Sequence, residues 1–186
     1  MRCFVSVEMN EESTRILESL QAELRRIGID TRFARPEQMH LTLAFLGEIS
    51  EEAARQKVEE LEKIDFEKFD VELGGIGFFP NEKFVRVVWV GCESGGKLEE
   101  LRQKVWNAVA AGTAAEKEKN FSAHATLARL KSRKNVDKLL KWAEEKNAAG
   151  ETLGRFTVSS VEFKQSILGG PAGAEHKTIG QVFTRD

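Results

Sequence analysis

The feature that most constrains how this chain folds is an eight-residue stretch that occurs twice. The stretch "HLTLAFLG" begins at His40, and "HATLARLK" begins at His124. The two copies share His, Thr, Leu, Ala and Leu at matching places, and they contain two of the 3 histidines in the chain. A repeat of this kind indicates two copies of one structural unit, so we expect two related halves, each containing one copy.

Each copy reads as a β-strand that separates polar from apolar side chains. Side chains on a strand alternate between its two faces. His40 and Thr42 therefore share one face, while Leu41 and Leu43 share the other. The same alternation holds for the copy at 124–131, so each strand presents an imidazole and a hydroxyl on one face and anchors itself in a core with the other.

The order of the remaining segments predicts an α+β fold. Pairs of strands joined by short turns favour antiparallel sheets over the parallel sheets of strand–helix–strand units. The length of 186 residues suits one compact domain or two small lobes that share a core. From periodicity and end signals we expect helices at 10–28, 50–64, 95–112 and 135–150, and strands at 2–8, 39–47, 69–80, 83–92, 124–130, 155–168 and 178–185, with a glycine-rich loop at 169–176.

Charge and cysteine content exclude several classes of protein. A formal net charge of −2 does not suit a protein that coats long nucleic acid. The 2 cysteines, Cys3 and Cys92, form no CxxC motif and are expected to be buried free thiols in a reducing compartment. The apolar run at the N-terminus is interrupted by Glu8 and is too short for a signal peptide or a membrane span, so a cytoplasmic protein without a membrane partner is expected.

Two imidazoles that face each other suit acid–base chemistry at a phosphate. A neutral histidine removes a proton from water, and a charged one donates a proton to a leaving oxygen. The hydroxyls of Thr42 and Thr126 can hold the non-bridging oxygens of a phosphate between His40 and His124. Two histidines without neighbouring carboxylates do not form a zinc site, so neither a metal nor another cofactor is expected.

The paired motifs resemble those of the two-histidine phosphoesterases. Within that superfamily, "RFARPEQMHLTLAFLGE" and "FSAHATLAR" are similar to the RNA 2′,3′-cyclic phosphodiesterases, also called LigT-like or 2′-5′ RNA ligase-like proteins. The resemblance covers nearly the whole chain. It implies that residues 1–186 form a single bilobal α+β domain, with two pseudo-symmetric lobes of antiparallel sheet, a central cleft and helices on the outside.

The resemblance also implies roles for the motif residues. The family reaction opens a 2′,3′-cyclic phosphate to a 2′-phosphate, with His40 as the acid that protonates the 3′ oxygen and His124 as the base that activates water; the sequence does not fix this polarity. Thr42 and Thr126 bind the phosphate. Arg129 matches a basic residue of many relatives and is a candidate substrate ligand. Strict alternation turns it away from the cleft unless a bulge or a strand end intervenes, and a solvated surface arginine is the equal alternative.

Other cations and one substitution remain open at this point. Arg35, Lys131 and Arg133 are candidates for a cationic rim, with solvated surface as the simpler interpretation. Many relatives carry a tyrosine after the glycine-rich loop, near the place where this chain has His176. That histidine either substitutes for the tyrosine or has no role in the site.

The expected partners are RNA ends or small nucleotides that carry a 2′,3′-cyclic phosphate, bound by a monomer without an obligate protein partner. Two other activities fit the same cleft: joining of RNA ends through a 2′-5′ linkage, and hydrolysis of a small cyclic nucleotide phosphate. A non-catalytic nucleotide-binding module is the third alternative.

Overall fold

Two antiparallel sheets and four α-helices make up the computed structural model, which describes residues 1–115, 121–170 and 173–184. The elements in chain order are β1 (Arg2–Glu8), α1 (Glu11–Ile27), β2 (Thr31–Phe33), a 3-10 turn (Pro36–Gln38), β3 (His40–Glu48), α2 (Glu51–Leu61), β4 (Phe69–Asn81), β5 (Phe84–Glu93), α3 (Lys97–Val109), β6 (His124–Leu130), α4 (Val136–Ala149), β7 (Gly154–Val158), β8 (Ser160–Gly170) and β9 (Gly173–Phe183).

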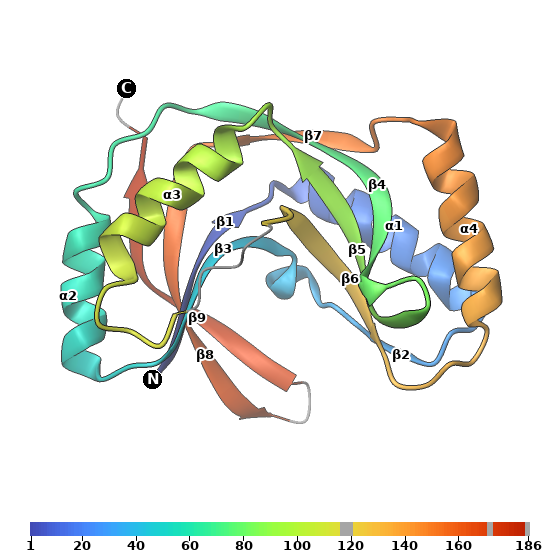
Figure 1. Ribbon diagram of the computed structural model, residues 1–186, viewed down its shortest axis with the longest axis horizontal. Coiled ribbons are helices and arrows are strands. Elements are labelled where there is room, and N and C mark those ends of the chain that lie inside the picture. The colour runs from blue at the N-terminus through green and yellow to red at the C-terminus, as the bar shows by residue number, and fades with distance from the viewer. Residues whose placement is uncertain (116–120, 171–172, 185–186) are drawn as a thin grey trace.

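Each sheet forms one lobe with its own pair of helices. The first sheet has the strand order β3-β1-β8-β9 and is covered by α2 and α3, on the left of Figure 1. The second has the order β2-β6-β5-β4-β7 and is covered by α1 and α4, on the right. The expected α+β fold, with antiparallel sheets and helices outside, is confirmed.

The lobes are not the two halves of the sequence. Helix α1 comes from the N-terminal half, yet it packs on β6 and β7 of the second sheet. Strands β8 and β9 come from the C-terminal half, yet β8 pairs with β1 in the first sheet. The chain thus passes repeatedly between the lobes, but each copy of the repeated stretch remains in its own lobe, on β3 and on β6.

Helix α1 shows how the local sequence fixes an element of this core. The Asn10 side chain accepts a hydrogen bond from the backbone N–H of Ser13 at 2.9 Å and so caps the helix. Gly28 ends it in the left-handed conformation, with φ of 74°. Between these ends the helix buries one apolar stripe, Leu17, Leu20 and Leu24. The buried apolar residues of both lobes form one continuous cluster, which includes the free thiols of Cys3 and Cys92.

Two predictions near the C-terminus are wrong. The single strand expected at 155–168 is two strands, because β7 pairs with β4 in the second sheet and β8 pairs with β1 and β9 in the first. No glycine or proline marks the change of sheet at Ser159, so the sequence pattern does not reveal it. The expected loop at 169–176 is partly strand, since β9 begins at Gly173; residues 171–172 lie outside the described part.

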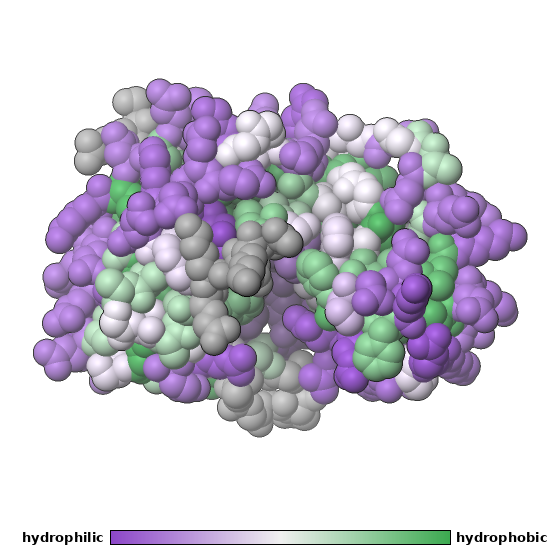
Figure 2. Space-filling model, viewed as in Figure 1, coloured by the Kyte–Doolittle hydropathy of each residue, from purple (hydrophilic) through white to green (hydrophobic). Residues whose placement is uncertain are grey.

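The surface of the molecule is mostly polar at the outer edges of both lobes (Figure 2). Among the described residues, no helix has the length and apolar character that crossing a membrane requires.

Candidate active site

A cleft of about 620 Å³ lies between the two sheets and contains all three histidines of the chain. His40 and Thr42 line it from β3, and His124 and Thr126 line it from β6. Strand β3 is an edge strand of the first sheet, and β6 lies beside β5 in the second. The fold therefore brings both copies of the repeated stretch to one cavity.

A β-bulge occurs at the same place in both copies. In β3, Thr42 pairs with Ser6 and Ala44 with Val5, which leaves Leu43 without a partner residue. In β6, Thr126 pairs with Trp89 and Ala128 with Val88, so Leu127 is the extra residue.

The bulge reverses the alternation of side chains along each strand. In both copies the bulged leucine and the alanine after it are buried. The next residue, Phe45 in one copy and Arg129 in the other, then lines the cleft on the same side as the histidine and threonine. Arg129 thus lies at the cleft, although strict alternation directs it away.

The His124 imidazole is held in one tautomer by the backbone. Its Nδ1 lies 2.7 Å from the carbonyl oxygen of Ser122. A carbonyl only accepts, so Nδ1 carries the proton, and Nε2 of the neutral ring is the basic nitrogen. The rings of Phe79 and Trp89 contact His124, with centroid distances of 4.8 and 5.8 Å. This packing fixes the ring plane.

The His40 imidazole packs between two other rings. Phe4 stacks on it at a centroid distance of 5.1 Å, and His176 meets its edge, also at 5.1 Å. His176 in turn contacts Phe4 at 4.9 Å. His176 lies on β9 and lines the cleft, so the third histidine adjoins the first. The sequence leaves open whether His176 has a role in the site, and the structure places it at the cleft.

A buried ammonium group lies beside this ring cluster, on the strand next to Phe4. Lys164 on β8 is 6% exposed and forms ion pairs with Glu8 at 2.7 Å and Glu162 at 3.5 Å. Burial, and then the charge of Lys164 and the neighbouring His176, lower the pKa of His40 from 6.5 to about 3. Burial also lowers the pKa of His176, and Lys164 and Arg35 lower it further. Both rings are therefore neutral at pH 7.

The two threonine hydroxyls form no hydrogen bond with any residue that the structure describes. Thr42 and Thr126 are half-buried, and both line the cleft. A hydroxyl has one donor and two acceptor sites, so each is available to an oxygen of a bound phosphate.

The remaining cations proposed from the sequence lie elsewhere. Arg35 ion-pairs with Glu37 at 3.0 Å and donates to the carbonyl of Ala174, so it ties β9 to the segment before β3. Arg133 donates to a backbone carbonyl between β4 and β5 at 3.2 Å. These two and Lys131 are not among the described residues that line the cleft.

Arginines that the sequence did not single out line the cleft beside Arg129. They are Arg2 on β1, Arg32 on β2 and Arg102 on α3. Arg32 begins the segment "RFARPEQMHLTLAFLGE", but no sequence pattern gives any of the three a role. Each reaches the cleft through the pairing or packing of its own element and not through the repeated stretch.

Within the described part of the chain, no group of three or more His, Cys, Asp or Glu side chains is arranged to hold a metal ion. The chemistry available in the cleft is that of three imidazoles, two threonine hydroxyls and the guanidinium groups near them.

Residues 7–89 match the family described as LigT like Phosphoesterase. An RNA 2′,3′-cyclic phosphodiesterase of Aeropyrum pernix is 36% identical over 167 residues, which cover 89% of this chain and 93% of that protein. A protein of the same name from Archaeoglobus fulgidus is 32% identical, over 96% of this chain and 98% of its own.

Solved structures share the fold over nearly the full length. The crystal structure of a Thermus thermophilus protein has a TM-score of 0.75 and 25% identity, and the match covers 97% of this chain and 96% of that one. E. coli LigT complexed with 3′-AMP has a TM-score of 0.74 at 19% identity, over 100% and 98% of the two chains.

Proposed function

This chain belongs to the LigT-like phosphoesterases, and we propose that it hydrolyses the 2′,3′-cyclic phosphate of an RNA end or a nucleoside to a 2′-phosphate. One observation carries the proposal: two His-Thr pairs, from two separate sheets and with the same bulge after each pair, line one cleft. An arrangement with a phosphate between them uses all four side chains.

The reaction needs one proton removed and one delivered. The neutral base takes a proton from water, and the water oxygen forms a bond to phosphorus. The bond between phosphorus and the 3′ oxygen breaks, and the charged acid gives its proton to that oxygen. The hydroxyls of Thr42 and Thr126 donate to the non-bridging oxygens, whose negative charge they stabilise. The product is a 2′-phosphate with a free 3′ hydroxyl, and the proton has moved from one histidine to the other.

The surroundings of His40 favour it as the base. The productive form holds one proton on the two histidines. Burial of the His40 ring, and then the ammonium of Lys164, disfavour that proton on His40. We therefore propose that His40 activates water and His124 protonates the leaving oxygen. This is the reverse of the polarity that the family resemblance implies. The carbonyl of Ser122 accepts from Nδ1 of His124 in either protonation state, so Nε2 is the atom that donates.

The decisive experiment uses the four nucleoside 2′,3′-cyclic monophosphates in the presence of a chelator. We expect hydrolysis, with the nucleoside 2′-phosphate as the only isomer formed, identified by chromatography against both standards. His40→Ala and His124→Ala are the matched variants, and Arg26→Ala, on the surface of α1, is the control. Release of the 3′-phosphate, or equal turnover by the His124→Ala enzyme, would contradict the proposal.

The oligomeric state and the domain organisation of the enzyme are part of the same proposal. We propose that both lobes form one domain and act as a monomer. Light scattering should then give the mass of a single chain, and unfolding should be one transition, because the apolar core is continuous between the lobes.

A further inference from the structure

Two arginines lie side by side at one end of the cleft. Arg32 on β2 is the direct cross-strand partner of Arg129 on β6. Partners of this kind project from the same face of the sheet, with their Cβ atoms close together. Phe33, the next residue, is covered by the guanidinium of Arg25 at 4.3 Å. Arg32 and Arg129 are both exposed, and both line the cleft.

Neither of these guanidinium groups has a partner in the described part of the chain. No hydrogen bond or ion pair joins Arg32 or Arg129 to a described side chain. Like charges directly opposite each other destabilise a sheet. At the far side of the same sheet the chain avoids this cost, since Arg155 on β7 pairs with its cross-strand neighbour Glu72 on β4. Arg32 and Arg129 have no such carboxylate partner among the described residues, and an anion bound between them would offset their charge.

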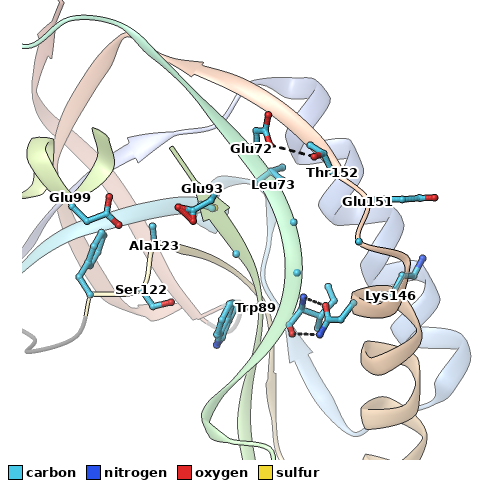
Figure 3. A pocket seen from close by; sticks show the side chains of 18 residues that line it. Glu72, Leu73, Trp89, Glu93, Glu99, Ser122, Ala123, Lys146, Glu151 and Thr152 are labelled. Atoms are coloured by element: carbon cyan, nitrogen blue, oxygen red, sulfur yellow. Dashed lines mark hydrogen bonds between the residues drawn. The ribbon is translucent and has the colours of Figure 1, made fainter. Parts of the chain in front are cut away.

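The other end of β6 has the opposite charge. Ser122 and Ala123, directly before His124, line a second cavity of about 590 Å³ beside Glu93 and Glu99 (Figure 3). Glu72 and Glu151 also line this cavity. Lys146 is the one cation among the described residues that line it, and it forms an ion pair with Glu23 of α1 at 2.9 Å. A polyanion is repelled at this end and attracted at the other.

We propose that Arg32 and Arg129 together bind the phosphodiester on the 5′ side of the terminal nucleotide, so that the preferred substrate is an oligonucleotide ending in a 2′,3′-cyclic phosphate. The proposal rests on the function proposed above. Guanidinium groups bind phosphate oxygens through paired hydrogen bonds. Because of the bulge, Thr126 and Arg129 pair with residues only two positions apart on β5. They are therefore separated by about 7 Å along the strand, at roughly 3.3 Å per residue, which one nucleotide and an arginine side chain span together.

The buried arginine at the cleft does not compete for this role. Arg102 is 7% exposed, and its guanidinium packs against the rings of Phe121 and Trp106 at 4.4 and 5.8 Å. A strand that continues beyond the terminal nucleotide must leave the cleft into solvent, and a buried group cannot lie along that path. Arg32 lies on the edge strand of its sheet and is exposed, so it can.

The fourth arginine at the cleft belongs to the other lobe. Arg2 on β1 is in the first sheet, and its cross-strand neighbour on β3 is Glu48. An acidic neighbour offsets its charge, whereas the neighbour of Arg32 is a second arginine. The pair on β2 and β6 is therefore the stronger anion site.

The test compares two substrates in each enzyme. One is uridine 2′,3′-cyclic phosphate, and the other is the dinucleotide UpU with the same cyclic end. The wild-type enzyme should have a higher kcat/KM for the dinucleotide, and Arg32→Ala should lower the ratio about tenfold, the lower range for one hydrogen bond to a charged group. Arg32→Lys should lower the ratio of the two kcat/KM values less than Arg32→Ala does. Arg26→Ala removes a positive charge that lies away from the cleft, and it should leave the ratio unchanged. A dinucleotide with a neutral methylphosphonate linkage should behave like the mononucleotide.

Salt gives an independent readout. The plot of log kcat/KM against log salt for the dinucleotide should become shallower by about 0.7 in Arg32→Ala, the value for one phosphate contact to a single strand. The inference is wrong if the wild-type ratio is near one, if Arg32→Ala leaves the ratio unchanged, or if Arg102→Gln or Arg2→Ala lowers it instead.

Failure of the proposed function is a separate outcome. It would appear as hydrolysis of neither substrate by the wild-type enzyme. The Arg32 inference would then be decided by calorimetry, from the affinity ratio of UpU 2′-phosphate to uridine 2′-phosphate in the wild-type and Arg32→Ala proteins. A ratio that Arg32→Ala lowers supports the phosphodiester site, and a ratio near one in the wild-type protein overturns it.

Discussion

Replacing Lys164 with methionine should raise the pKa of His40. The His40 imidazole has a pKa of about 3, against an ordinary value of 6.5. The difference of about 3.5 corresponds to about 5 kcal/mol at 1.36 kcal/mol per pKa unit. Burial is the largest cause and the Lys164 ammonium the second. Methionine keeps most of the volume and removes the charge, so we expect the pKa of His40 to rise by about one unit, the lower range for a close charge.

Two measurements report this change. The chain has three histidines, so the Hε1 resonance of each ring can be assigned by single substitutions and followed through a pH titration. In kinetics, the acid limb of kcat/KM reports the base of the free enzyme. It should lie far below the ordinary histidine value of 6.5 in the wild-type enzyme and move upward in Lys164→Met. The fold must be checked by circular dichroism at each pH, because Lys164 is buried.

The controls separate the loss of the Lys164 charge from the effect of leaving its two carboxylate partners unpaired. Lys164→Met leaves Glu8 and Glu162 without their ammonium partner, which also raises the pKa of His40. The double variant Lys164→Met/Glu8→Gln should therefore give a value between the single variant and the wild type. Lys146→Met, which removes an ion-paired lysine on α4, should leave His40 unchanged. A wild-type His40 that titrates near its ordinary pKa, or one that Lys164→Met does not move, would refute this account.

Three further outcomes follow from the same site. His40→Ala and His124→Ala should each lower kcat by about 10²- to 10⁴-fold, and the double variant should lose less than the product of the two, which single-turnover kinetics can measure. Thr42→Ala should weaken binding of the phosphate by about 1.5–3 kcal/mol, seen as the affinity for a nucleoside 2′-phosphate in calorimetry. The free energy of unfolding should fall as pH drops below 6.5, by about 2 kcal/mol at pH 5 from His40 alone, because the unfolded chain binds the proton that native His40 excludes. Chemical denaturation at pH 7 and at pH 5 measures this fall, which should be smaller in His40→Asn.

The sequence predicts the elements of this fold better than their arrangement. The sequence predicts the strands that carry the repeated stretch, β3 and β6, to within about one residue of their observed ends, because alternation and a glycine or charged residue near each end mark them. It does not predict the division of residues 155–168 between two sheets. A strand that changes sheets keeps its β-forming residues throughout, and only its pairing partners differ, which a single sequence does not contain.

The charged surroundings of His40 were not predictable for a related reason. Lys164 is one of many lysines in the chain, and its burial depends on β8 lying next to β1. His176 follows the second motif by many residues in the chain. It reaches the cleft because β9 pairs with β8 in the first sheet, the sheet that also contains His40. The sequence identified the chemical groups of the site, but long-range strand pairing decides which groups perturb them.

The bulges explain how a repeated stretch produces an asymmetric site. Before the bulge, both copies present the same pair, histidine and threonine, and this symmetry suits a tetrahedral phosphate held between them. After the bulge, both strands turn their next side chain toward the cleft, and here the copies differ, with Phe45 in one and Arg129 in the other. An aromatic ring offers a base a stacking surface, whereas a guanidinium beside Arg32 attracts a phosphate. A nucleotide has the same asymmetry, with a base on one side of its ribose and a charged backbone on the other. The symmetric part of the repeat thus suits the reacting phosphate, and the residue that departs from symmetry gives the cleft the means to fix the direction in which the substrate lies.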